Sequence, residues 1–219
     1  MKIIGYIHIC QIGDWKRSFK MIMDRVLSSG LYSISNEIRC GVVNNNSRII
    51  PDDAFNDSKL KIVCEGHSRE YERPTLLHMK RAAAEFDGED TRYFYFHTKG
   101  LRWFGTSQEP FVVDWINLLI YWNIDKWRDA TKALDAFDTY GCNYYCKDAA
   151  YPPHYSGNFF WVTARHLNTL PPVIGGGYND PEFWVCLTRP NAYNSFSSGL
   201  EGMGHYTNPF PESAYREER

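Results

Sequence analysis

The chain has 219 residues, of which 43% are hydrophobic, enough to bury the core of one stable domain. Its formal net charge of −2, without a block of like charges, argues against a non-specific nucleic-acid-binding protein, which needs a basic face. No uncharged and predominantly apolar segment reaches the roughly 18 residues that cross a bilayer, and the N-terminus turns polar too early for a signal peptide. We therefore expect one domain over residues 1–219, alone or within a longer polypeptide, and a cytoplasmic location.

Strand-like and helix-like segments alternate along the first half of the chain. Apolar runs predict strands at residues 2–10, 37–43, 59–64 and 92–97. Apolar residues at helical spacing, with Asp14 as a cap and prolines in two first turns, predict helices that begin at Trp15, Arg73, Glu109 and Asp125.

The second half of the chain is less regular. It offers strand-like runs at 142–146 and 158–163, a short helix from Asp180, and a loop-rich tail from Ser195. Together the elements predict an α/β fold with a mostly parallel central sheet, flanking helices and an irregular C-terminal half.

The aromatic strand at 92–97 runs directly into His97-Thr98-Lys99-Gly100. In open α/β sheets, ligands gather beyond the carboxyl ends of the strands. Lys99 can neutralise a phosphate as a point charge, and His97 can donate to an oxygen or ligate a metal. The segment therefore favours a phosphate or pyrophosphate site, the alternative being a strand end with solvated polar residues.

Two further segments combine polar groups with aromatic residues. Ser156, Gly157 and Asn158 precede an aromatic strand, which suits a sugar ring with polar edges and an apolar face, or else a tight turn. Asp180 and Glu182 open a short helix after three glycines, and their carboxylates suit a general base or a hydroxyl-binding site, or else an ordinary helix cap.

Three isolated residues carry weaker signals. His205 lies in a glycine-rich segment and is either a loop residue or a ligand from the C-terminal region. Glu65 and Arg73 flank the third strand and the following helix, where they contact either a ligand or solvent.

Several common motifs are absent from the sequence. There is no P-loop, no G-x-G-x-x-G after the first strand and no G-x-S-x-G, which removes the main support for those nucleotide-binding and hydrolase classes. The six cysteines form no C-x-x-C pair, which favours free thiols over a disulfide framework.

The order of the motifs resembles that of the nucleotide-sugar glycosyltransferases with the GT-A fold. The resemblance is carried by Glu-Arg-Pro-Thr-Leu (72–76), Tyr-Phe-His-Thr-Lys-Gly (95–100), Ser-Gly-Asn-Phe-Phe-Trp (156–161) and Pro-Glu-Phe-Trp (181–184). It spans most of the chain and is closest to a group from bacteria and large DNA viruses, which includes the first domain of chlorovirus glycosyltransferases of capsid-glycan synthesis. It implies a GT-A-like (Rossmann-like) fold and transfer of a hexose from a UDP-sugar to a sugar hydroxyl of a glycan, in the host cytoplasm if the protein is viral.

The resemblance also implies a donor site at the ends of the parallel strands. The uridine would lie near His8, Gln11 and Glu65. The pyrophosphate would lie near His97, Thr98 and Lys99, with Arg73 close by, and the donor sugar would contact Ser156, Gly157 and Asn158.

Most GT-A enzymes hold Mn²⁺ or Mg²⁺ with an Asp-x-Asp motif, where this chain has His97-Thr98-Lys99. Two solutions are open. Lys99 can replace the charge of the metal, or Mn²⁺ can be held by His97, His205 and the diphosphate. Imidazole ligands suit Mn²⁺ better than Mg²⁺, so we expect a Mn²⁺-assisted site.

An inverting reaction requires a carboxylate that accepts the proton of the acceptor hydroxyl. Asp180 or Glu182 is the expected base, with Asp148 and Asp114 as further candidates; in a retaining reaction these acids would only orient hydroxyls. The expected partners are a UDP-sugar and a glycan acceptor. The alternatives are a sugar-nucleotide nucleotidyltransferase and a non-catalytic carbohydrate-binding module.

Overall fold

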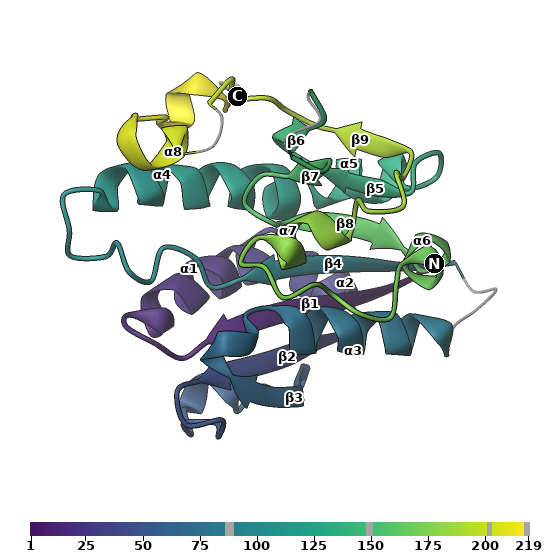
Figure 1. Ribbon diagram of the computed structural model, residues 1–219, viewed down its shortest axis with the longest axis horizontal. Coiled ribbons are helices and arrows are strands. Elements are labelled where there is room, and N and C mark those ends of the chain that lie inside the picture. Colours follow the sequence, from purple (N-terminus) through teal and green to yellow (C-terminus); the bar gives the residue numbers. More distant parts are fainter. Residues whose placement is uncertain (86–89, 148–150, 201–202, 217–219) are drawn as a thin grey trace.

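The computed structural model describes residues 1–85, 90–147, 151–200 and 203–216, and a seven-stranded sheet forms its centre (Figure 1). The strand order is β3-β2-β1-β4-β8-β5-β9. The strands are β1 (Lys2–Cys10), β2 (Glu37–Asn44), β3 (Leu60–His67), β4 (Thr91–His97), β5 (Thr139–Gly141), β8 (Phe160–Thr163) and β9 (Ala192–Asn194). β8 is antiparallel to both of its neighbours, whereas the other pairs are parallel. The predicted α/β fold with a mostly parallel sheet is therefore confirmed.

Helices cover both faces of the sheet (Figure 1). They are α1 (Trp15–Ser28), α2 (Leu31–Ile34), α3 (Arg73–Ala84), α4 (Glu109–Ile120), α5 (Trp127–Ala133), α6 (Ala164–Thr169), α7 (Asp180–Trp184) and α8 (Gly204–Thr207). Short 3₁₀ turns lie at Asp53–Phe55, Ser68–Glu70 and Glu212–Ala214.

The buried central strand β4 divides its side chains between two hydrophobic cores. Phe94 and Phe96 pack with α1, α4 and α5, whereas Tyr93 and Tyr95 pack with α3, α6 and α7. Successive side chains of a strand point to opposite faces, so one aromatic run supplies both cores. Gly5 of β1 lies directly against the Phe94 ring. A Cβ at this position would lie 2.1 Å from a ring carbon, so this close contact requires glycine.

Two predicted elements differ from the structure. The predicted strand at 142–146 is wrong: it is interrupted at Asn143, whose left-handed backbone (φ 52°) separates β5 from a small hairpin. That hairpin pairs β6 (Tyr144–Tyr145) with β7 (His154–Tyr155). The helix expected from Asp125 begins instead at Trp127, after a π turn over Tyr121–Asp125 that continues α4.

All six cysteines are free, as their spacing predicts. In the described ranges, no helix combines the length and the apolar character that a membrane crossing requires.

Candidate functional site

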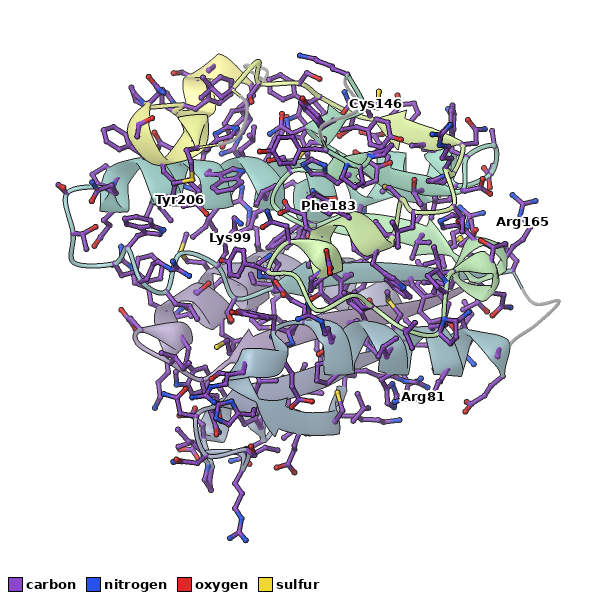
Figure 2. All side chains as sticks on the ribbon, viewed as in Figure 1. Arg81, Lys99, Cys146, Arg165, Phe183 and Tyr206 are labelled. Atoms are coloured by element: carbon purple, nitrogen blue, oxygen red, sulfur yellow. The ribbon has the colours of Figure 1, made fainter. Side chains whose placement is uncertain are left out.

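A cavity of about 720 Å³ lies at the carboxyl end of β4. Nine tyrosine, tryptophan and phenylalanine side chains line it, together with Lys99, Glu72 and Glu182. Figure 2 shows Lys99, Phe183 and Tyr206 in the region between α4 and α7. Concave, mostly apolar sites with a few convergent polar groups are typical ligand sites.

The backbone at the end of β4 aims Lys99 into this cavity. The Lys99 N–H donates to Ser18 Oγ at 2.8 Å, and the Ser18 hydroxyl donates back to the Lys99 carbonyl at 3.0 Å. The ammonium Nζ lies 3.9 Å from the centre of the Trp115 ring, a cation–π contact. No ion pair of Lys99 occurs among the described residues, so its charge is available to an anionic ligand.

His97 lies at the floor of the cavity. Its Nε2 is 3.0 Å from the Gly157 carbonyl oxygen, and its Nδ1 is 3.1 Å from the Thr98 carbonyl oxygen. Burial, and secondly the Lys99 ammonium, lower the pKa of His97 to about 4. The neutral ring has one N–H and therefore satisfies one of the two carbonyls.

Glu72, the residue before α3, is a cavity carboxyl that sequence reasoning missed. Its Oε1 lies 3.8 Å from His97 Nδ1, and burial raises the pKa of the carboxyl above its ordinary value. The available signal was its place in the Glu-Arg-Pro-Thr-Leu motif, directly before a proline-marked helix start.

Asn158 carries the clearest sign of a missing partner. The residue is 3% exposed and lines the cavity, yet neither its amide oxygen nor its amide nitrogen has a hydrogen-bond partner in the described structure. Buried amide groups are normally paired, because an unpaired one costs about 1–3 kcal/mol. The side chain therefore offers a donor and an acceptor to a ligand.

The antiparallel direction of β8 explains why Asn158 meets the end of β4. Residues that precede β8 lie at the same sheet edge as residues that follow β4. Gly157 takes φ 97°, and a Cβ on it would lie 2.8 Å from Leu119, so the turn requires glycine. Ser156 also lines the cavity, as predicted for the sugar-binding segment.

The structure separates the predicted carboxylates. Glu182 lines the cavity, and its Oε1 accepts a hydrogen bond from the Gly157 N–H at 2.6 Å. Asp180 instead accepts from the Gly177 N–H at 2.7 Å within its own turn, and it is not among the described residues that line the cavity. Asp114 accepts from the Phe210 N–H at 3.1 Å, and Asp148 lies outside the described residues.

Two of the residues predicted to contact uridine, Gln11 and Glu65, form hydrogen bonds with the backbone of residues 49–50. Gln11 donates through Nε2 to the Ile50 carbonyl at 2.9 Å and accepts from the Ile50 N–H at 2.8 Å. Glu65 accepts from the Ile49 N–H at 3.1 Å. Uridine at Gln11 would have to replace both of its hydrogen bonds to Ile50.

Two further residues of the predicted donor site serve the fold. His8 Nδ1 lies 2.8 Å from the Thr75 hydroxyl, and burial, followed by His97, lowers the pKa of His8 to about 3. Thr98 accepts from the Cys10 N–H at 3.0 Å and so joins the ends of β4 and β1. In the described structure, neither side chain belongs to the cavity wall.

Arg73 ties the first turn of α3 to the glycine-rich segment before α7. It donates through Nε to the Gly175 carbonyl at 2.7 Å and through a terminal nitrogen to the Gly177 carbonyl at 2.5 Å. Its predicted contact with a donor is thus replaced by two backbone contacts, and its visible role is to hold that segment in place.

The residues expected to hold Mn²⁺ do not fit a metal site. His205 is 1% exposed and stacks on Trp115 at 5.1 Å between ring centres, and its Nε2 accepts from the Asn143 amide at 3.3 Å. Both nitrogens of His97 lie at hydrogen-bond distance from carbonyl oxygens, so a metal at either nitrogen would have to displace one of these contacts. Over the described residues, no group of three or more His, Cys, Asp or Glu side chains is placed to bind a metal. The involvement of Mn²⁺ stays a prediction.

No family model and no curated protein matches this sequence. The cavity therefore carries the functional argument through its own residues. It combines three cationic side chains (Lys99, Arg102 and Lys147), an unpaired amide, an anchored carboxylate and flat aromatic walls, a set that can bind an anionic leaving group and a polyhydroxylated ring.

We expect the protein to lose stability between pH 6.5 and 4.5. Burial lowers the pKa of His97 and His205 to about 4 and that of His8 to about 3, whereas an unfolded imidazole has a pKa near 6.5. The unfolded chain then binds more protons as the pH falls through this window, so acid favours unfolding.

Urea midpoints measured from pH 7 to 4.5 test this expectation. His205→Phe, which retains a ring against Trp115, should make the midpoint less dependent on pH. A wild-type midpoint that stays constant over this range would contradict it.

Proposed function

We propose that this protein is a glycosyltransferase that moves a hexose from a UDP-sugar to a sugar hydroxyl of a glycan. The observation that carries the proposal is the pairing of a cavity cation, Lys99, with the unpaired amide of Asn158 at the end of the central strand. The Lys99 ammonium can neutralise a diphosphate leaving group. The hydroxyls of a sugar can form the hydrogen bonds that the Asn158 amide lacks.

In the proposed reaction, the acceptor oxygen forms a bond to the anomeric carbon while the bond from that carbon to the diphosphate breaks. Negative charge grows on the departing UDP, and Lys99 stabilises it electrostatically. Asn158 and Ser156 hold the donor hexose. Glu182, anchored through one oxygen by the Gly157 N–H, accepts the acceptor proton on its second oxygen if configuration inverts.

The GT-A fold is part of the same proposal. It is supported by the motif order in the sequence and by a mostly parallel sheet in which one antiparallel strand follows β4 in space. Capsid-glycan synthesis, a viral source and a cytoplasmic location follow from the resemblance and stay predictions.

One other function is favoured by a specific observation. Nine aromatic side chains around the cavity also suit a carbohydrate-binding module without catalysis. Such a module has no need of a cation for a diphosphate, and its affinity for sugars should not depend on UDP.

Calorimetric titration with UDP, with and without Mn²⁺, tests the proposed function. We expect UDP to bind the wild-type protein and UMP, which lacks the second phosphate, to bind more weakly. The titration with Mn²⁺ measures the metal dependence directly. A protein that binds simple glycosides but shows no heat with UDP would contradict the transferase and favour the module.

A further inference from the structure

A group of aromatic rings forms one wall of the cavity at the β6–β7 hairpin. This hairpin platform consists of Tyr144 and Tyr145 of β6, His154 of β7 and Phe183 of α7, all of which are half-buried and line the cavity. The Tyr145 and His154 rings lie 5.4 Å apart, and His154 meets Phe183 edge-on at 5.0 Å. Tyr145, His154 and Phe183 thus form one connected group of rings from three chain segments, and Tyr144, which contacts Tyr155 at 5.1 Å, lines the cavity separately.

The chemistry of the hairpin platform suits a neutral sugar ring. Its aromatic faces can stack on the C–H face of a pyranose. His154 Nδ1 lies 2.8 Å from the Pro152 carbonyl oxygen, and since a carbonyl only accepts, Nδ1 carries a proton and donates it there. Nε2 is left to form a hydrogen bond with a sugar hydroxyl.

The position of the hairpin platform distinguishes it from the diphosphate end of the cavity. Phe183 directly follows Glu182 on α7, so the platform adjoins the carboxylate. Lys99 and its partner Trp115 come from the segment after β4 and from α4. Glu182 and Phe183 both line the cavity, so an acceptor ring held at Phe183 would lie on the side of the cavity that carries the proposed base.

We infer that the hairpin platform is the acceptor subsite and binds the terminal pyranose of a glycan through ring stacking. This inference rests on the proposed function, because only a transferase requires an acceptor. Phe183 and His154 then determine the affinity for the acceptor, whereas the part of the cavity around Lys99 determines the affinity for the donor.

Saturation-transfer NMR with methyl glucopyranosides, galactopyranosides and mannopyranosides tests the subsite, and UDP is kept saturating throughout. We expect at least one glycoside to receive saturation at its ring C–H groups. Phe183→Ala and His154→Ala should each weaken that glycoside about 2–10-fold, the range for loss of one stacked ring. Phe137→Ala is the matched control, since Phe137 stacks edge-on with Tyr193 away from the cavity.

The UDP affinity of each variant, measured by calorimetry, reports whether it has kept its fold. Unchanged UDP affinity with weakened glycoside binding in both variants, and none in the control, supports the inference. If no glycoside binds the UDP complex, or if one binds equally to wild type and Phe183→Ala, the inference is overturned while the transferase proposal stands. Glycoside binding that depends on Phe183 in a protein that ignores UDP overturns the proposed function, and the acceptor role with it.

Discussion

Lys99→Ala is expected to lower kcat for sugar transfer about 10²–10³-fold, the usual loss when one preorganised charge-stabilising group is removed. The ammonium is the cation expected to face the leaving diphosphate, and its loss leaves the Trp115 ring in place. The fold should persist, because the segment is fixed by backbone bonds to Ser18 rather than by the ammonium. UDP release from a panel of UDP-hexoses measures the rate, and urea unfolding measures the stability.

Lys126→Ala is the matched control for this variant. Its ammonium also lies over an aromatic ring, at 5.5 Å from the centre of Tyr121, but it is not among the described residues that line the cavity. The control should retain the wild-type rate. Undiminished transfer by a folded Lys99→Ala protein would reject the role of this cation.

Glu182→Gln is expected to lower transfer about 10²–10⁴-fold, the range for loss of a general base. A glutamine retains an oxygen that can accept from the Gly157 N–H, so the turn before β8 should keep its shape. The Glu182→Gln variant loses the basicity of the second carboxylate oxygen. Transfer to an acceptor and hydrolysis of the UDP-sugar are measured side by side, and transfer should fall more.

Asp180→Asn provides the control two residues away on α7. Its carboxylate accepts only from the Gly177 N–H in the described structure, and an asparagine oxygen can do the same, so activity should change little. Equal losses of transfer and hydrolysis in Glu182→Gln would point to donor positioning. A small loss of transfer would favour a retaining reaction, in which no base is required.

The strands and the long helices could be predicted because their signals are local. The apolar run at residues 2–10 corresponds to the observed β1, and the helical spacing after Asp14 corresponds to α1, whose first turn Asp14 caps at the Arg17 N–H. The break at Asn143 could not be predicted, since its left-handed turn is fixed by residues distant in sequence. The Asn143 side chain accepts from the Ser198 N–H and contacts His205.

The candidate site could be predicted from the sequence only where its residues directly follow a predicted strand. Lys99 directly follows the predicted aromatic strand, so its place at the carboxyl edge of the sheet follows from the fold class. Asn158 precedes a strand, and it reaches the same edge only because β8 is antiparallel, which no local signal predicted. The wider donor site could not be predicted, because the partners of Gln11 and Glu65 are backbone groups of Ile50 and Ile49, and these contacts depend on how a loop distant in sequence folds back onto β1 and β3. Glu72 could be singled out from the sequence only as part of the Glu-Arg-Pro-Thr-Leu motif, because its place in the cavity depends on a 3.8 Å approach to His97, which is distant in sequence.

The two hydrogen bonds that Arg73 donates to backbone carbonyls allow the neighbouring sequence to be varied. Two backbone carbonyls, at Gly175 and Gly177, connect the first turn of α3 to the segment that carries α7. A backbone carbonyl can accept a hydrogen bond whichever side chains neighbour it. Tyr178 and Asn179, which line the cavity directly after this anchor, can therefore be exchanged while Arg73 still holds the segment and Glu182 and Phe183 stay in place, which would vary one wall of the cavity without rebuilding β1–β4.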